Sequence, residues 1–341
     1  MSVRRGRAEV ILTHDGRYAV AWELPQRKVA IMSKTLAAFV TLLCLLTRAD
    51  NDFKVTLLGT GTPIPDPDRF GPSTLVEAGN KKLLFDAGRG VPIRLRQINV
   101  PIGKIDALFL THYHSDHTAG IPDLWLTGWL GFNRKQPFRV IGPVGAKALM
   151  ANLEKAYALD IKIRLEDEKL LPEGIATIAD EFEKDGVVYD EDGVKVIAFT
   201  VDHGAAIKPA VGYRIDYKGH SVVISGDTRY DQNVIKYGTG VDLLIHEVCI
   251  ARSELLSNIY IQRVIAHHTS PREAGQVFSL AQPKLAAYTH LVLLASDKVP
   301  RASVDDIAAG TRETYSGPLQ IGEDLMSFEI GDTVIVRQRN P

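Results

Sequence analysis

The sequence predicts one α/β domain over residues 51–341, preceded by an N-terminal extension over residues 1–50. The chain has 341 residues, of which 45% are hydrophobic and 24% charged, an ordinary composition for a soluble globular protein. This composition excludes a disordered chain, a collagen-like fibre and a protein with several membrane spans. From Phe53 onward, short apolar segments with strand character alternate with helical segments, and this alternation indicates an α/β fold.

The N-terminal extension contains a signal-like segment. Residues 36–46 are uncharged and mostly apolar, but they are too few to span a bilayer. Because a lysine precedes them and small residues follow, the segment 32–49 matches a secretory signal cleaved before Asp50, with Met32 as the true start. We therefore expect a periplasmic or secreted protein without a stable membrane span. A short buried helix in a cytoplasmic protein is the alternative.

The expected strands are short and apolar. Gly79-Asn80 and Lys218-Gly219 are expected to form hairpin turns between neighbouring strands. The expected strands are residues 54–58, 73–78, 81–86, 107–110, 194–201, 210–216, 221–225, 243–246 and 284–289.

Two helices follow from local signals. The spacing of apolar residues predicts a helix over 144–157. Ser270-Pro271-Arg272-Glu273 predicts a helix start, because it combines a Ser N-cap, a Pro at the first helical position and a Glu three residues after the cap. This second helix is expected to run to about Ala281.

Cysteine content and charge limit the function further. Two cysteines, Cys44 and Cys249, allow neither a disulfide framework nor a cysteine-based zinc module. A net charge of −1 gives no bulk electrostatic case for a nucleic-acid-binding protein. Residues 154–192 hold thirteen Asp/Glu against five Lys/Arg, and we expect a solvated acidic insertion with one or two helices there.

The densest chemical signal is the segment Thr111–His117, Thr-His-Tyr-His-Ser-Asp-His, directly after the expected strand 107–110. In extended backbone, His112 and His114 point to the same side, so both imidazoles can reach one metal ion. The turn that follows directs Asp116 and His117 toward a second site. Neutral imidazole and carboxylate suit zinc, and also iron or manganese.

With the motifs that follow it, this segment resembles the metallo-β-lactamase superfamily over roughly residues 53–330. The resemblance implies an αββα sandwich with a dinuclear metal site, holding two zinc ions, at one edge of the sheets. Asp227 would bridge both ions, and Asp86 would orient a ligand imidazole. The remaining implied ligands are His112, His114 and His203 for the first ion, and Asp116, His117 and His290 for the second.

Three further motifs resemble the tRNase Z group of phosphodiesterases. In that group a Glu and a His form an acid pair beside the metals, which by position are Glu247 and His268, with His267 as the competing residue. A charged imidazole can protonate a leaving alkoxide or phenoxide, so we expect Glu247 and His268 to be catalytic. We also expect a catalytic role for Asp116. The motifs are Leu58–Pro63 (Leu-Gly-Thr-Gly-Thr-Pro), Leu244–Glu247 (Leu-Ile-His-Glu) and His267–Pro271 (His-His-Thr-Ser-Pro).

The expected reaction is hydrolysis of a small anionic ester, a phosphodiester or an aryl sulfate, by a hydroxide that bridges the two metals. The same motifs also resemble a group of exported, arylsulfatase-like proteins. Trp125 and Trp129 would either pack in the core or wall a pocket for an aromatic leaving group. The alternative is ribonuclease Z, a tRNA 3′-processing endoribonuclease. It ranks second because the acidic segment 154–192 lies where tRNA-processing members carry a basic arm, and acidic residues repel the phosphate backbone of RNA. A lactonase or β-lactamase ranks third, since the acid pair is normally absent there. Family members are often homodimers.

Overall fold

The computed structural model describes residues 8–12, 18–22, 52–132 and 134–338. The chain divides into two units, Met1–Asp50 and Asn51–Pro341. In the first unit, β1 (Ala8–Leu12) and β2 (Tyr18–Trp22) form an antiparallel pair. The signal-like segment 32–49 lies outside the described residues. Within the described part of the chain, no helix has the length and apolar character needed to cross a membrane.

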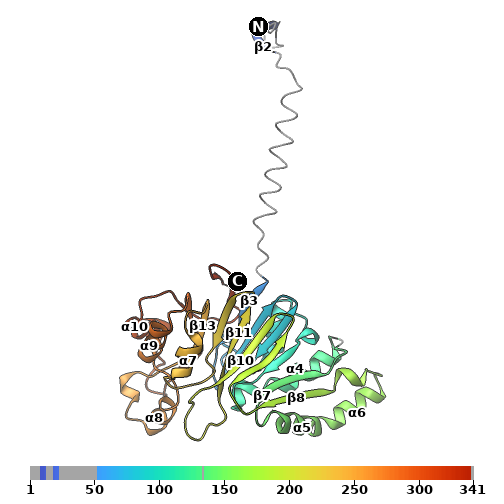
Figure 1. The fold of residues 1–341 in the computed structure, drawn as a ribbon, viewed down its shortest axis with the longest axis vertical. Coiled ribbons are helices and arrows are strands. Elements are labelled where there is room, and N and C mark those ends of the chain that lie inside the picture. The colour runs from blue at the N-terminus through green and yellow to red at the C-terminus, as the bar shows by residue number, and fades with distance from the viewer. Residues whose placement is uncertain (1–7, 13–17, 23–51, 133, 339–341) are drawn as a thin grey trace. The chain divides into compact units, whose positions relative to one another are not determined.

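Two mixed β-sheets form the centre of the second unit (Figure 1). In the described residues, the first sheet has eight strands in the order β17-β16-β3-β4-β5-β6-β7-β8. Its strands β5, β6 and β7 run parallel, so their carboxyl ends meet at one edge. The strands are β3 (Phe53–Gly59), β4 (Ser73–Ala78), β5 (Lys81–Phe85), β6 (Ala107–Phe109), β7 (Phe138–Pro143), β8 (Thr177–Phe182), β16 (Ser327–Glu329) and β17 (Ile335–Arg337).

The second sheet has seven strands in the described residues, in the order β15-β14-β13-β12-β11-β10-β9. Strands β12, β13 and β14 run parallel in it. The strands are β9 (Gly186–Glu191), β10 (Val194–Thr200), β11 (Val211–Tyr217), β12 (His220–Ile224), β13 (Leu243–Ile250), β14 (Leu285–Leu293) and β15 (Leu319–Ile321).

Helices cover the outer faces of the two sheets. Figure 1 shows α7, α9 and α10 on one side of the strands and α4, α5 and α6 on the other. The α-helices are α2 (Val91–Gln97), α3 (Ser115–Thr118), α4 (Ile121–Leu130), α5 (Ala146–Ala156), α6 (Ala158–Glu166), α7 (Gln232–Gly238), α8 (Ile259–Ile265), α9 (Pro271–Ala281) and α10 (Val304–Arg312). Short 3₁₀ turns are η1 (Ile102–Lys104), η2 (Pro172–Gly174) and η3 (Ser253–Leu255).

In the described residues, three apolar clusters pack these layers together. One lies between the sheets, where Phe85 and Phe109 of the first sheet stack beside Tyr213 of the second. A second joins the first sheet to α2, α4 and α5, and a third joins the second sheet to α7, α9 and α10. The layers therefore follow the order αββα, which confirms the predicted sandwich.

Local signals predict several elements well. The strand over 73–78 and its hairpin to β5 are confirmed, with Ala78 pairing with Lys81 across the Gly79-Asn80 turn. The helix after Ser270 is confirmed from Pro271 to Ala281, and its capping box is complete. The expected end of the strand 284–289 is wrong, because β14 continues to Leu293.

The acidic segment 154–192 differs from the expected solvated insertion. It contains the end of α5 and all of α6, β8 and β9. Strand β8 pairs with β7 in the first sheet and β9 pairs with β10 in the second. The segment therefore supplies one edge strand to each sheet, in addition to the expected helix.

Candidate metal centre and acid pair

The short buried strand β6 positions the first predicted ligands. His114 is the N-cap of α3 in extended backbone. The ring nitrogens His112 Nε2 and His114 Nδ1 therefore come within 3.0 Å of each other. Helix α3 then turns the chain and buries Asp116 and His117.

All seven predicted ligands fall into two groups, in each of which the potential ligand atoms lie within 4.8 Å of one another. Both sheets contribute, because β6 belongs to the first sheet while β10, β12 and β14 belong to the second. The first group is His112, His114, His203 and Asp227, and the second is Asp116, His117 and His290.

Asp227 lies between the two groups. Its Oδ2 atom is 3.8 Å from His112 Nε2 and 3.6 Å from His203 Nε2. The same oxygen is 3.4 Å from His117 Nε2 and 3.3 Å from His290 Nε2. One carboxylate oxygen thus faces imidazoles of both groups, as the predicted bridging role requires.

A glycine before Asp227 allows this approach. Gly226 has a φ of +63°, a conformation that suits glycine. A Cβ at this position would lie 2.5 Å from the carbonyl oxygen of Val211, so a side chain has no room. The turn after β12 therefore depends on glycine to direct Asp227 inward.

Asp86 contacts His117 as the resemblance implies. Its Oδ2 lies 2.7 Å from His117 Nδ1, and its two oxygens also accept hydrogen bonds from the Thr111 backbone N–H (2.9 Å) and hydroxyl (2.8 Å). When Nδ1 carries the proton and donates to Asp86, the Nε2 lone pair of His117 faces Asp227. Such a contact fixes the tautomer and orientation of a metal-binding imidazole.

His203 is oriented in a similar way by a backbone group. Its Nδ1 lies 2.7 Å from the carbonyl oxygen of His267, so this nitrogen donates and Nε2 is left to face Asp227. The carbonyl of His267 is a contact that sequence reasoning missed, because nothing in a motif shows where a backbone oxygen points.

The surroundings of the first group favour neutral imidazoles and an ionised Asp227 carboxylate. Burial lowers the pKa of His203 to about 4, and burial with neighbouring imidazoles also lowers the pKa of His112 and of His114. Although burial opposes its ionisation, Asp227 has a pKa well below the usual range, because His290 and His117 stabilise the carboxylate. Neutral imidazoles and ionised carboxylates are the forms that bind metal.

The donor set fits divalent metal ions. Buried Nε2 of His117 has no hydrogen-bond partner in the described structure, although two carboxylates lie within 4 Å. Imidazole nitrogen with carboxylate oxygen is typical of zinc, and also of iron and manganese. The side chains therefore fit the two ions that the sequence predicts.

His290 occupies a distorted position in β14. Pairing with β13 shifts register between His246 and Val248, whose partners are Tyr288 and Leu291. The extra residue lies in β14, where His290 has a φ of +44°. This bulge brings His290 Nε2 within 3.2 Å of Asp116 Oδ2.

Glu247 and His268 lie together beside both groups. Glu247 Oε1 is 3.2 Å from His268 Nδ1 and accepts a hydrogen bond from the Thr269 N–H at 3.0 Å. The ring of His268 is 5.0 Å from that of His203 and 5.8 Å from that of His290. Burial alone would lower the pKa of His268, but the Glu247 carboxylate raises it to about 9. In the metal-free protein the imidazole therefore favours its charged form, next to the predicted metal ligands.

Residues 81–291 match a family model described as a beta-lactamase superfamily domain. The chain belongs to the metallo-β-lactamase superfamily. Relatives place it in the ribonuclease Z-like branch of that superfamily. It is 34% identical over 284 residues to a ribonuclease Z of Mycolicibacterium gilvum, covering 81% of this chain and 96% of the relative. It is also 34% identical over 282 residues to a ribonuclease Z of Mycobacterium marinum, covering 81% of this chain and 98% of the relative.

Solved structures share the fold. The metallo-β-lactamase fold protein YhfI from Bacillus subtilis superimposes with a TM-score of 0.61 and 23% identity, covering 81% of this chain and 98% of that one. The short form of human tRNase Z gives a TM-score of 0.60 and 23% identity, covering 80% and 98%. Both comparisons agree with the αββα layers of this superfamily member.

Trp125 and Trp129 of the superfamily domain belong to the core. Both side chains are buried, at 0% and 2% exposure. Their indole N–H groups donate to the carbonyl oxygens of Ile175 (2.9 Å) and Leu171 (2.8 Å). They join α4 to the segment before β8 and do not wall a pocket for an aromatic leaving group.

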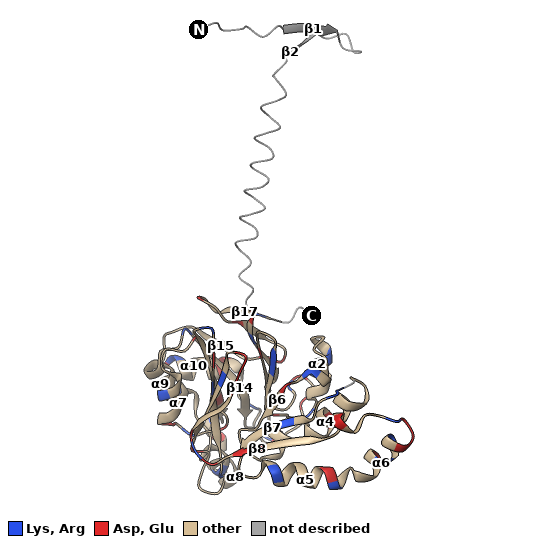
Figure 2. Cartoon of the chain, turned by 45° about the vertical axis from the view of Figure 1, so that its right-hand side comes forward, with Lys and Arg blue, Asp and Glu red and all other residues tan. Residues whose placement is uncertain are grey.

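Basic partners from outside the acidic segment neutralise part of its charge. Arg139 of β7 contacts Asp180 at 2.9 Å and Glu191 at 2.6 Å, and Lys81 of β5 contacts Glu191 at 3.1 Å. Glu181 accepts hydrogen bonds from two backbone N–H groups at the start of α5. Both basic and acidic residues also lie along α5 and α6 (Figure 2). A count made inside residues 154–192 therefore overstates the negative charge at this surface.

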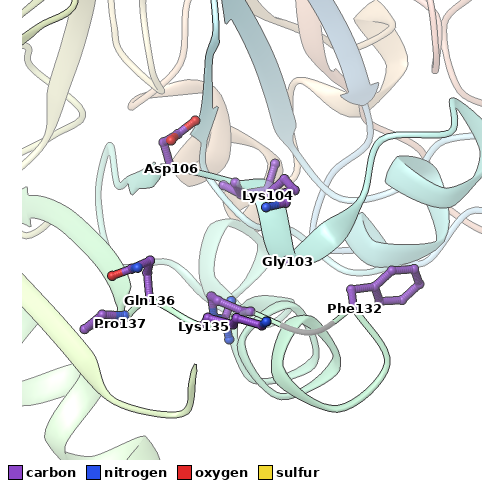
Figure 3. A pocket seen from close by; sticks show the side chains of 9 residues that line it. Gly103, Lys104, Asp106, Phe132, Lys135, Gln136 and Pro137 are labelled. Atoms are coloured by element: carbon purple, nitrogen blue, oxygen red, sulfur yellow. The ribbon is translucent and has the colours of Figure 1, made fainter. Parts of the chain in front are cut away.

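A cavity of about 540 Å³ lies away from the predicted site residues. Its lining includes Lys104 and Asp106, which precede β6, and Lys135 and Pro137, which precede β7 (Figure 3). The predicted ligands follow β6 instead, at its other end. Since β6 and β7 are parallel, this cavity opens at the opposite edge of the sheet from the metal centre.

Proposed function

We propose that this protein is a metal-dependent phosphodiesterase that cleaves RNA at the 3′ end of precursor tRNA. The observation that carries the proposal is the position of the Glu247–His268 pair beside the two groups that share Asp227. Relatives named ribonuclease Z, similar along nearly their whole length, support RNA as the substrate. They favour the predicted alternative, tRNA processing, over hydrolysis of a small phosphodiester or aryl sulfate.

Seven side chains would hold the metal ions. His112, His114 and His203 would bind the first ion, Asp116, His117 and His290 the second, and Asp227 both. When bound, two divalent ions acidify a water molecule and neutralise charge on the attacked phosphate. Zinc fits the donor set best, with manganese or iron as alternatives.

The protein's own side chains orient the reactants and supply a proton. Asp86 and the His267 carbonyl hold two imidazoles in the tautomer that presents Nε2 to the centre. Asp116, whose pKa is lowered by His290 and His117 against the effect of burial, accepts a hydrogen bond from the attacking water. His268, charged and held by Glu247, donates its proton to the departing ribose oxygen.

The acidic segment does not exclude an RNA substrate. Residues 154–192 are strongly acidic when counted alone, with thirteen Asp/Glu and five Lys/Arg. Ion pairs with Lys81 and Arg139 reduce that charge, and β8 and β9 place part of the segment in the sheets. The repulsion expected for an isolated acidic arm is therefore weaker than the sequence predicts.

A substrate panel tests the proposal. The zinc-loaded full chain is incubated with precursor tRNA carrying a 3′ trailer, bis-nitrophenyl phosphate and nitrophenyl sulfate, with His114→Ala as the inactive control. We expect cleavage of the tRNA at its 3′ end and no turnover of the sulfate. Turnover of the sulfate without tRNA cleavage would contradict the proposal and support the small-ester hydrolase.

The homodimer and the cleaved signal stay predictions from the sequence. Light scattering on the full chain tests the dimer, which requires twice the mass of one chain. N-terminal sequencing of the protein recovered from its native cells tests the signal, which predicts a chain that begins at Asp50.

A further inference from the structure

His267 lies at the metal centre, but its side chain has no part in the mechanism above. Its ring centroid is 5.1 Å from that of His203 and 4.8 Å from that of His268. Ring nitrogens of these three histidines lie within 4.8 Å of one another. The side chain of His267 is half-buried, whereas that of His203 is buried. The imidazole of His267 is therefore partly exposed to solvent while it borders two residues of the centre.

The ring of His267 has unused hydrogen-bonding capacity. Its Nδ1 atom is buried and has no partner among the described residues. In the same part of the chain, no side chain or backbone group bonds to its Nε2, and this nitrogen is not among the buried unpartnered atoms. Nε2 is thus accessible to a molecule that enters the site. A polar imidazole held this close to the centre without a protein partner is suited to contact a ligand.

The backbone holds His267 in place independently of its side chain. Its carbonyl oxygen accepts the hydrogen bond from His203 Nδ1 at 2.7 Å. Gly204, the residue after His203, has a φ of +106°, and a Cβ there would lie 3.2 Å from the Cβ of His267. The segment with His203 and Gly204 therefore packs closely against the main chain of His267. This packing and the hydrogen bond hold the backbone of His267, from which the imidazole extends.

We propose that His267 is a substrate-binding residue, whose Nε2–H donates a hydrogen bond to a nonbridging oxygen of the scissile phosphate. The inference rests on the proposed function for the identity of the ester. A phosphodiester offers charged nonbridging oxygens in addition to the oxygen that leaves. His268, paired with Glu247, serves the leaving oxygen, and His267 contacts a different oxygen of the same group. A hydrogen bond to a charged oxygen is stronger than one between neutral groups.

The test compares four variants of the zinc-loaded full chain by calorimetry with inorganic phosphate. His267→Ala removes the ring, His267→Gln places an amide N–H near the position of Nε2, and His267→Asn places one near Nδ1. We expect His267→Ala and His267→Asn to weaken phosphate binding about tenfold or more, and His267→Gln to restore most of it. His220→Ala is the control, because His220 is the first residue of β12 and Asp227 follows the other end of this strand.

Metal content and kinetics separate a substrate contact from a structural role. All four variants should bind as much zinc as the unmodified chain, because the His267 carbonyl is kept. With precursor tRNA, His267→Ala should raise KM about tenfold and change kcat less than about threefold, the pattern for an interaction made equally in ground and transition states. Unchanged phosphate affinity, or loss of zinc from His267→Ala, would overturn the inference. If the unmodified chain cleaves no RNA while its phosphate binding depends on His267, the proposed function fails and this inference stands.

Discussion

His117 Nδ1 lies 2.7 Å from Asp86 Oδ2, and this contact links a predicted metal ligand on α3 to the residue that follows β5. Asp86 has a φ of +59°, a conformation that is uncommon for residues other than glycine and that Asn and Asp tolerate best. The same carboxylate binds Thr111, the residue before His112. One acidic side chain thus fixes both the loop that carries the ligands and the tautomer of one of them.

Replacing Asp86 should weaken metal binding. Asp86→Asn keeps the backbone conformation and one oxygen for the Thr111 N–H, but it weakens the acceptor for His117. Loss of such a supporting contact lowers metal affinity about 10- to 100-fold. Competition for zinc with a chromogenic chelator measures the effect. Asp106→Asn, which alters a carboxylate bonded to the Lys82 N–H, should leave zinc affinity unchanged, and equal losses in both variants would contradict the role of Asp86.

Replacing Asp227 should affect both ions, whereas replacing His290 should affect one. Asp227 Oδ2 faces imidazoles of both groups, so Asp227→Ala is expected to bind fewer than two zinc ions, each more weakly. His290→Ala removes a donor from the second group only and should retain one tightly bound ion. Elemental analysis after dialysis distinguishes the two results. Retention of two tight ions by Asp227→Ala would exclude the bridging position.

The charge of His268 should make the stability of the metal-free protein depend on pH. Because Glu247 raises the folded-state pKa of His268 to about 9 from the ordinary 6.5, the pair stabilises the fold fully below pH 6.5. This contribution, about 3 kcal/mol from a shift of this size, is lost as pH rises through 9. Urea unfolding of the metal-free chain should therefore show stability falling between pH 6.5 and 9, and His268→Asn should reduce the slope. Equal slopes would contradict a charged His268.

Trp125 should contribute to stability and not to substrate binding. The ring is buried and its N–H bonds to Ile175, so Trp125→Ala should lower the free energy of unfolding by about 3–5 kcal/mol. Trp125→Phe keeps most of the packing and should cost about 1 kcal/mol for the lost hydrogen bond. Urea unfolding measures both. A raised KM for a nitrophenyl ester in Trp125→Phe, without loss of stability, would instead support an aromatic pocket.

Short-range patterns in the sequence predict those features that depend on neighbouring residues. The start of α9 is an example, because Ser270 and Glu273 form a capping box with each other's backbone and Pro271 follows at the first helical position. The close approach of His112 and His114 is another, since alternate residues in extended backbone share a side. The grouping of His203, Asp227 and His290 with them came from the family resemblance, because no local pattern brings residues together across two sheets.

Features that depend on distant partners were predicted poorly. The sequence predicts that β14 ends at Thr289, but pairing with β13 extends the strand through the bulge at His290. The charge of the acidic segment was counted without Lys81 and Arg139, which lie far from it in sequence and contact it only in the folded sheets. In both cases a tertiary contact outweighs the local signal.

The most direct test of the account is a crystal structure of the zinc-loaded chain with anomalous diffraction data collected on both sides of the zinc absorption edge. The account predicts two zinc peaks about 3.5–4 Å apart, with the Asp227 carboxylate between them. One peak should lie among His112, His114 and His203, and the other among Asp116, His117 and His290. A single peak, or two peaks of which Asp227 contacts only one, would contradict the shared dinuclear centre on which the proposed function depends.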